Sequence, residues 1–104
     1  MSHLLTPNIT EISTGSPYTI QTHSGIEEVF LITPDASSFT VNLPSAATVG
    51  AGYKYQIKNL SSSHSVTIDG SSAQKIDNEE TFVLSSQFDS VTLISNGTDE
   101  WFII

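Results

Sequence analysis

The 104-residue chain contains no cysteine and no arginine. Without cysteine, neither a disulfide bond nor a thiolate metal site can reinforce the fold. A chain of this length is expected to form one domain, and it buries a smaller share of its surface than a larger protein does. Oligomerisation is the remaining common way for such a chain to gain buried area.

Positive charge is scarce. Three lysines, Lys54, Lys58 and Lys75, stand against eleven acidic residues, which gives a formal net charge of −8 at pH 7. This charge repels phosphate backbones and anionic membrane surfaces, so we expect neither a nucleic acid nor a membrane as a partner. The plainest interpretation of the acidity is solubility.

Long apolar runs are also missing. No stretch approaches the roughly 18 consecutive apolar residues that a membrane-spanning helix needs. The first residues, MSHLLTPNIT, show neither a basic segment nor a long apolar segment, so no signal peptide is visible. We therefore expect the protein to be made in the cytoplasm.

Serine and threonine are abundant and together account for 29 of the 104 residues. From Tyr18 onwards, short apolar or alternating segments recur at intervals of roughly ten residues, separated by polar turns, which is typical of strands. The sequence therefore predicts an all-β fold for residues 18–104: a sandwich or barrel of about eight or nine short antiparallel strands.

The first 17 residues show no sustained period and contain Pro7, Gly15 and Pro17. We interpret residues 1–17 as an extended N-terminal arm. The arm carries apolar residues that could dock on the domain or on a neighbouring molecule, namely Leu4, Leu5, Ile9 and Ile12.

The chain ends in SVTLISNGTDEWFII, which predicts a hairpin with a two-residue turn at Asn96-Gly97. Its two strands carry large apolar residues on both faces, whereas a strand with one wet face carries them on one. One face, with Trp101, is expected to close the domain's own core. The other is predicted to be an oligomer interface, buried by a neighbouring protomer or by the arm, and comprises Thr92, Ile94, Phe102 and Ile104.

Residues that could perform chemistry are dispersed. His3, His23 and His64 are single histidines in loop-like segments, and the adjacent acids at 27–28 and 79–80 would point to opposite faces of an extended chain. A group of hard oxygen ligands does occur near two turns, namely Asp69, Asp77, Asn78 and Glu79. It lacks the pattern of a calcium loop, and we interpret it as turn-forming. We therefore predict no enzyme, and no catalytic, cofactor or metal site.

The order of motifs resembles a known family. The motifs are Leu43-Pro44, Tyr55, Ile57-Lys58-Asn59, Val66-Thr67-Ile68, Ile76-Asp77, Val91 to Leu93, Ser95 to Thr98 and Trp101. Over residues 28–104, their sequence resembles a β-module that recurs in tailed-bacteriophage virion proteins, such as the C-terminal domains of tail fibres and other appendages, and in capsid decoration or head-fibre-like proteins. The resemblance implies a virion structural protein without enzymatic activity, and such modules generally assemble as trimers.

The short chain with its arm favours one member of this class: a homotrimeric capsid decoration or cement protein on the particle surface, bound to the major capsid protein or another virion protein. A tail-fibre, spike or adaptor component that contacts host glycans is the alternative, with Tyr18, Tyr53 and Tyr55 as stacking candidates, although Tyr55 is expected to pack inward. A small carbohydrate-binding or hydrolytic domain is the second alternative.

Overall fold

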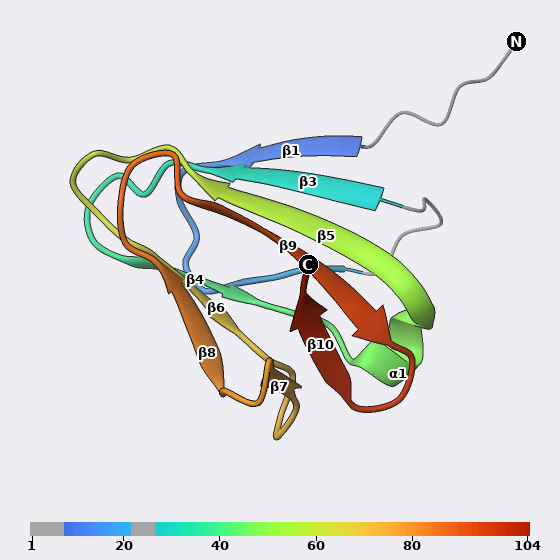
Figure 1. Cartoon of the computed structure of the whole chain (residues 1–104). Helices are drawn as coiled ribbons and strands as arrows, with labels where there is room; N and C mark the ends of the chain where they lie inside the picture. Colours follow the sequence, from blue (N-terminus) through green and yellow to red (C-terminus); the bar gives the residue numbers. More distant parts are fainter. Residues whose placement is uncertain (1–7, 22–26) are drawn as a thin grey trace, which may run out of the picture.

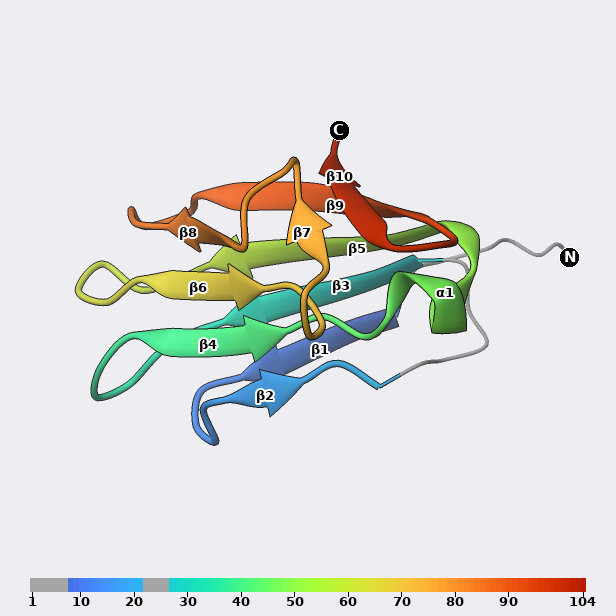
Figure 2. The same cartoon turned by 90° about the horizontal axis from the view of Figure 1, so that it is seen from below.

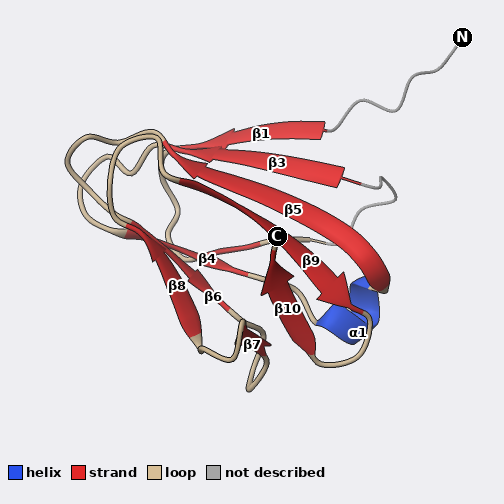
Figure 3. Cartoon of the chain, viewed as in Figure 1, coloured by secondary structure: helices blue, strands red, loops and turns tan. Residues whose placement is uncertain are grey.

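The computed structural model describes residues 8–21 and 27–104, and strands dominate this part of the chain (Figure 3). The described residues include one short helix, α1 (Ala46–Val49), which is ended by Gly50, whose φ is 93°. The strands are β1 (Asn8–Ile12), β2 (Tyr18–Thr19), β3 (Glu27–Ile32), β4 (Phe39–Asn42), β5 (Ala51–Asn59), β6 (Val66–Asp69), β7 (Lys75–Ile76), β8 (Thr81–Leu84), β9 (Ser90–Asn96) and β10 (Glu100–Ile103). The β-rich class predicted from the sequence is therefore confirmed.

The strands form two sheets on either side of one core (Figures 1 and 2). The six-stranded sheet has the order β1-β3-β5-β9-β10-β7, and the four-stranded sheet has the order β2-β4-β6-β8. Side chains from both sheets meet between them, including Phe30 and Ile57 from the first and Val41 and Ile68 from the second, and each of these four is completely buried.

From β1 to β6 the chain alternates between the sheets, so that each new strand lies on the sheet opposite the preceding one. A strand that runs out along one sheet is followed by a strand that returns along the other. The next strand of the first sheet therefore runs parallel to its neighbour. This winding explains the parallel pairs β1–β3, β3–β5, β2–β4 and β4–β6.

The antiparallel sandwich predicted from the sequence is not confirmed, because both sheets are mixed. In the described residues, antiparallel strand pairs are confined to β5–β9, β9–β10 and β6–β8, and β7 pairs with β10 in parallel. Alternation along a strand reports which face is buried, but it does not report the direction of the neighbouring strand.

Part of the predicted arm lies on the sheet. Strand β1 pairs with β3 along its whole length and forms one edge of the six-stranded sheet. Ile12 packs against the core, whereas Ile9 is 62% exposed. Leu4 and Leu5 lie outside the described residues. The division into an arm at 1–17 and a domain at 18–104 stays a prediction.

The C-terminal hairpin is present, but its turn is longer than predicted. Ser95 pairs with Trp101, and residues 97–99 connect the strands. Gly97 has a φ of 81°, while Asn96 contributes through its side chain: its Oδ1 accepts hydrogen bonds from the backbone N–H groups of Thr98, Asp99 and Glu100 at 2.9, 3.0 and 3.1 Å. The two-residue turn was therefore wrong, because an Asx-type cap replaced the positive φ expected at Asn96.

Candidate interaction surface

The four residues predicted as an oligomer interface lie together on the six-stranded sheet, on the side that faces away from the core. Phe102 is in register with Ile94, and the Ile104 N–H donates to the Thr92 carbonyl at 3.0 Å. Phe102 is 39% exposed and Ile104 is 65% exposed, while Thr92 and Ile94 are half-buried. The opposite side of the same hairpin carries Leu93 and Trp101, which are completely buried. The alternation of faces expected for this hairpin is thus present.

Strand register extends this surface across the sheet. Thr92 is opposite Gln56, which is opposite Val29, which is opposite Ile9. On β5, Lys54 is opposite Ile94 of β9, and Lys58 is opposite Leu31 of β3. We call this surface the outer face, and it comprises Ile9, Glu11, Val29, Leu31, Lys54, Gln56, Lys58, Thr92, Ile94, Phe102 and Ile104.

Two of the chain's three lysines lie on the outer face, both on the central strand β5. The Lys58 ammonium donates to the Phe88 carbonyl at 3.1 Å and lies 5.6 Å from the centre of the Phe88 ring, which is itself 58% exposed. In residues 53–59 polar and apolar residues alternate, and this pattern predicts that Lys54 and Lys58 point outward. It could not show that they share a surface with Ile94 and Phe102, because strand order is not encoded locally.

The described part of the predicted arm, residues 8–17, does not lie over this face. Strand β1 lies beside β3 at the far edge of the sheet from β10, so it extends the sheet instead of lying over it (Figure 1). The sequence predicts that a neighbouring protomer or the arm covers the outer face. The described part of the arm does not cover it.

The aromatic residues considered as sugar platforms are mostly interior. Tyr55 and Trp101 are completely buried with ring centres 5.4 Å apart, and the Trp101 Nε1 donates to the Pro44 carbonyl at 3.2 Å. Tyr18 and Tyr53 are half-buried and pack against the core. The inward orientation expected for Tyr55 is confirmed, and the bond to Pro44 links the Leu-Pro motif to the closing tryptophan.

The Tyr55 hydroxyl is buried without a hydrogen-bond partner among the described residues. Burial raises the pKa of this hydroxyl well above its usual value of about 10, and the charges of Tyr53 and Glu28 raise it further. Glu28 is opposite Tyr55 in strand register and is 1% exposed.

The Ile-Lys-Asn motif has three distinct structural roles. Ile57 fills the core, and Lys58 lies on the outer face. Asn59 is buried, and its Nδ2 donates to the carbonyls of His64 and Leu84 at 3.0 Å each, while its Oδ1 accepts from the Ser61 N–H at 2.8 Å. Asn59 therefore ties the six-stranded sheet to a strand of the other sheet.

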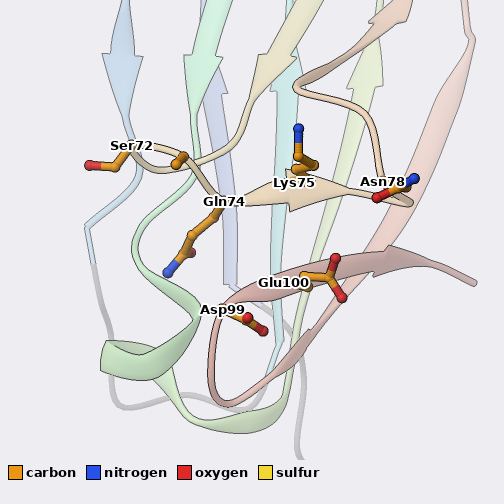
Figure 4. Close-up of a pocket in the computed structure, with 7 residues that line it drawn as sticks. Ser72, Gln74, Lys75, Asn78, Asp99 and Glu100 are labelled. Atoms are coloured by element: carbon orange, nitrogen blue, oxygen red, sulfur yellow. The ribbon is translucent and has the colours of Figure 1, made fainter.

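A polar hollow of about 460 Å³ lies between the β6–β7 loop, β7 and the β9–β10 turn (Figure 4). Its lining residues are Ser72, Ala73, Gln74, Lys75, Asn78, Asp99 and Glu100. Gln74 is engaged elsewhere: its Oε1 accepts from the Ala46 N–H at 2.9 Å and its Nε2 donates to Ser45 Oγ at 3.3 Å.

Of the group of oxygen ligands predicted near two turns, Asp77 and Asn78 lie in a turn followed by Glu79, whereas Asp69 is the last residue of β6. Asp77 and Asn78 adopt φ values of 49° and 71°, and the Asp77 Oδ1 accepts from the Ile103 N–H at 3.1 Å. Within residues 8–21 and 27–104 there is no group of three or more His, Cys, Asp or Glu side chains arranged to hold a metal ion. Of the three histidines, His64 is half-buried beside Ser61. His3 and His23 lie outside the described residues.

Within the described part of the chain, no helix is long and apolar enough to cross a membrane. Searches against models of protein families and against curated protein sequences find no significant match to this chain.

Proposed function

We propose that this chain is a structural protein of a tailed-bacteriophage virion, namely a homotrimeric decoration or cement protein on the capsid exterior. The observation that carries the proposal is the outer face. One side of the six-stranded sheet is filled by the core, yet the other side also carries large apolar residues, including Phe102 and Ile104. An acidic domain with such a two-sided sheet is suited to association. The motif order over residues 28–104 resembles the tailed-bacteriophage β-module, and this resemblance supports a protein of the virion.

The mechanism is adhesion. Burial of apolar surface stabilises an interface by about 25 cal/mol per Å² removed from water, so contact over Phe102, Ile104 and their neighbours favours assembly. The other side of β9 and β10 is fixed by Trp101 and Leu93 in the core. The outer face therefore needs little rearrangement before it binds, which lowers the entropic cost of association.

A structural role also agrees with how the polar groups are used. Asp77 and Asn96 hold turns, and Asn59 links the sheets. The two facing sheets around one core support the sandwich class for the fold, with mixed pairing in place of the antiparallel pairing of the initial prediction.

The decisive experiment locates the protein in purified particles. We expect mass spectrometry to detect the chain in virions and cryo-electron microscopy to show it on the capsid exterior, bound to the major capsid protein or another virion protein. Particles that lack the gene product should recover the density when purified protein is added. Density restricted to the tail tip would support the tail-fibre or spike alternative, and absence from particles would overturn the proposal.

The polar hollow favours a second candidate, in which a tail-fibre, spike or adaptor component contacts host glycans. The amide and carboxylate groups of Asn78, Asp99 and Glu100 are hydrogen-bonding partners that suit sugar hydroxyls. A glycan array with wild-type protein and a Glu100→Gln variant tests this candidate. Binding that the variant loses supports it, and an array without binding removes it.

A further inference from the structure

The sequence contains one asparagine that is followed by glycine, Asn96, and this residue is the last of β9. Asparagine-glycine pairs are the positions at which a polypeptide deamidates most readily, because glycine has no Cβ atom to shield its backbone nitrogen. Each of the other four asparagines precedes a residue whose side chain hinders this reaction, namely Ile9, Leu43, Leu60 or Glu79.

Deamidation uses the chain's own atoms and water. The Gly97 backbone nitrogen loses its proton and forms a bond to Asn96 Cγ, the bond between Cγ and Nδ2 breaks, and Nδ2 takes up a proton and leaves as ammonia. Water then opens the resulting five-membered imide at one of its two carbonyl carbons. The products are aspartate and isoaspartate, in which the main chain runs through Cβ and Cγ.

The folded hairpin engages the nucleophile of this reaction. The Gly97 N–H donates to Ser95 Oγ at 2.9 Å, and the Ser95 hydroxyl in turn donates to the Ala46 carbonyl at 3.0 Å. Ser95 is 3% exposed. The proton that the reaction must remove therefore points to a buried hydroxyl group and not to solvent.

The Asn96 carboxamide is also held in place. Its Oδ1 caps the turn by accepting the N–H groups of residues 98–100, and its Nδ2 donates to Asp99 Oδ1 at 3.2 Å. Closure of the imide ring turns the carboxamide towards the Gly97 nitrogen and expels Nδ2. The bond to Asp99 is then lost and the cap of the turn is disturbed, which costs free energy.

The backbone beside the carboxamide is packed against β5. Asn96 is in register with Ala51, and a Cβ atom placed on Gly97 would lie 2.7 Å from the Ala51 backbone nitrogen. The imide ring includes the bond between Cα and the carbonyl carbon of Asn96, and it fixes the rotation about this bond away from the extended value of a strand. Ring closure therefore requires the end of the hairpin to separate from β5.

We infer that Asn96-Gly97 is a covalent-modification site that the folded hairpin protects, and that it deamidates through a state in which the turn between β9 and β10 has opened. Folded proteins open locally at free energies below that of global unfolding. The isoaspartate product lengthens the main chain by one methylene group next to Ala51, so a chain that has reacted does not restore the original turn. The inference is independent of the proposed function.

The test compares native and urea-unfolded samples of the full-length protein in the same mildly alkaline buffer. Peptide mass spectrometry measures the rate at which the Asn96 amide becomes an acid, and chromatography separates the aspartate from the isoaspartate product. We expect the native protein to react at least about tenfold more slowly than the unfolded protein, which corresponds to an opening free energy of ~1.4 kcal/mol or more.

Two variants remove the protecting contacts one at a time. Ser95→Ala removes the acceptor of the Gly97 N–H, and Asp99→Ala removes the acceptor of Nδ2 at an exposed position. Each should raise the native rate by about three- to tenfold, the effect of one lost hydrogen bond, without changing the unfolded rate. Ser90→Ala, at an exposed position of the same strand, is the matched control and should react like the wild type.

Trp101 fluorescence in urea identifies conditions in which every variant is folded, so that an increased rate reports the turn and not global unfolding. Equal rates in native and unfolded wild-type protein would overturn the inference, and so would an unfolded chain that does not react at Asn96. Folded Ser95→Ala and Asp99→Ala variants that both react at the wild-type rate would overturn it as well. None of these outcomes concerns the presence of the chain in virions, so they leave the proposed function unaffected.

Discussion

At the scale of single residues, the side chains of residues 8–21 and 27–104 include one buried polar group without a hydrogen-bond partner. The Tyr55 ring lies among aromatic rings, with the ring centres of Phe30, Tyr53 and Trp101 at 5.9, 5.2 and 5.4 Å from its own, and its hydroxyl is buried. A buried hydroxyl without a partner costs free energy, because its hydrogen bonds to water are lost and not replaced. The ring is therefore stabilising, and its oxygen is not.

We predict that Tyr55→Phe leaves the free energy of unfolding unchanged or raises it by up to about 2 kcal/mol at neutral pH. The pH dependence gives a second test. The pKa of Tyr55 is higher in the folded than in the unfolded state, so above about pH 10 the unfolded chain loses this proton while the folded chain retains it. Wild-type stability should then fall with rising pH by up to about 1.4 kcal/mol per unit from this group.

Urea unfolding between about pH 9 and about pH 11 measures both effects. Tyr55→Phe should show a shallower alkaline loss than the wild type. Tyr18→Phe, which leaves Tyr55 in place, is the matched control and should keep the wild-type slope. A marked loss of stability in Tyr55→Phe at neutral pH would show that the hydroxyl does have a partner.

At the scale of elements, β1 is the strand that the sequence did not reveal. Its five residues are flanked by Pro7 and by the Gly15 to Pro17 segment, and so short a stretch gives no distinct period. Its place follows from the parallel pairing with β3, which is a long-range contact. The strand nevertheless contributes to the core through Ile12.

The two isoleucines of β1 provide a matched pair. We predict that Ile12→Ala lowers the free energy of unfolding by about 1–3 kcal/mol, since a partly buried side chain loses its packing. Ile9→Ala should change it by less than about 0.5 kcal/mol, because Ile9 is 62% exposed. Chemical denaturation of both variants measures the difference. Equal effects would show that β1 is not held on the sheet as described.

The final hairpin shows what the sequence can and cannot predict at this scale. Alternation identified the buried face with Trp101 and Leu93, and also the opposite face with Phe102 and Ile94. Alternation along one strand does not show which strands lie beside it. Residues 28–33 form a continuous apolar run, which predicts burial on both faces of the strand, whereas Val29 and Leu31 are half-buried on the outer face. Periodicity describes one strand at a time, and a surface depends on the order of several strands.

At the scale of the whole molecule, the two sheets share one core and should unfold together. Ile57 in the six-stranded sheet and Ile68 in the four-stranded sheet are both completely buried in that core. We predict that Ile57→Ala and Ile68→Ala each lower the free energy of the same single transition by about 2–5 kcal/mol. Trp101 fluorescence and far-ultraviolet circular dichroism should give coincident curves in both variants. Two separate transitions would show that the sheets are independent units.

The winding of the first six strands has a consequence for how such a domain can vary in length. Each turn of the winding adds one strand to each sheet, and every strand up to β6 follows this rule. Among the described residues β1 and β2 are edge strands, so a further turn placed before β1 would add one strand beside each and widen both sheets by one strand spacing of about 4.8 Å. Further strands of this winding can therefore be added at the edge formed by β1 and β2. At the opposite end the winding stops, because β9 runs antiparallel beside β5 and β10 runs antiparallel beside β9.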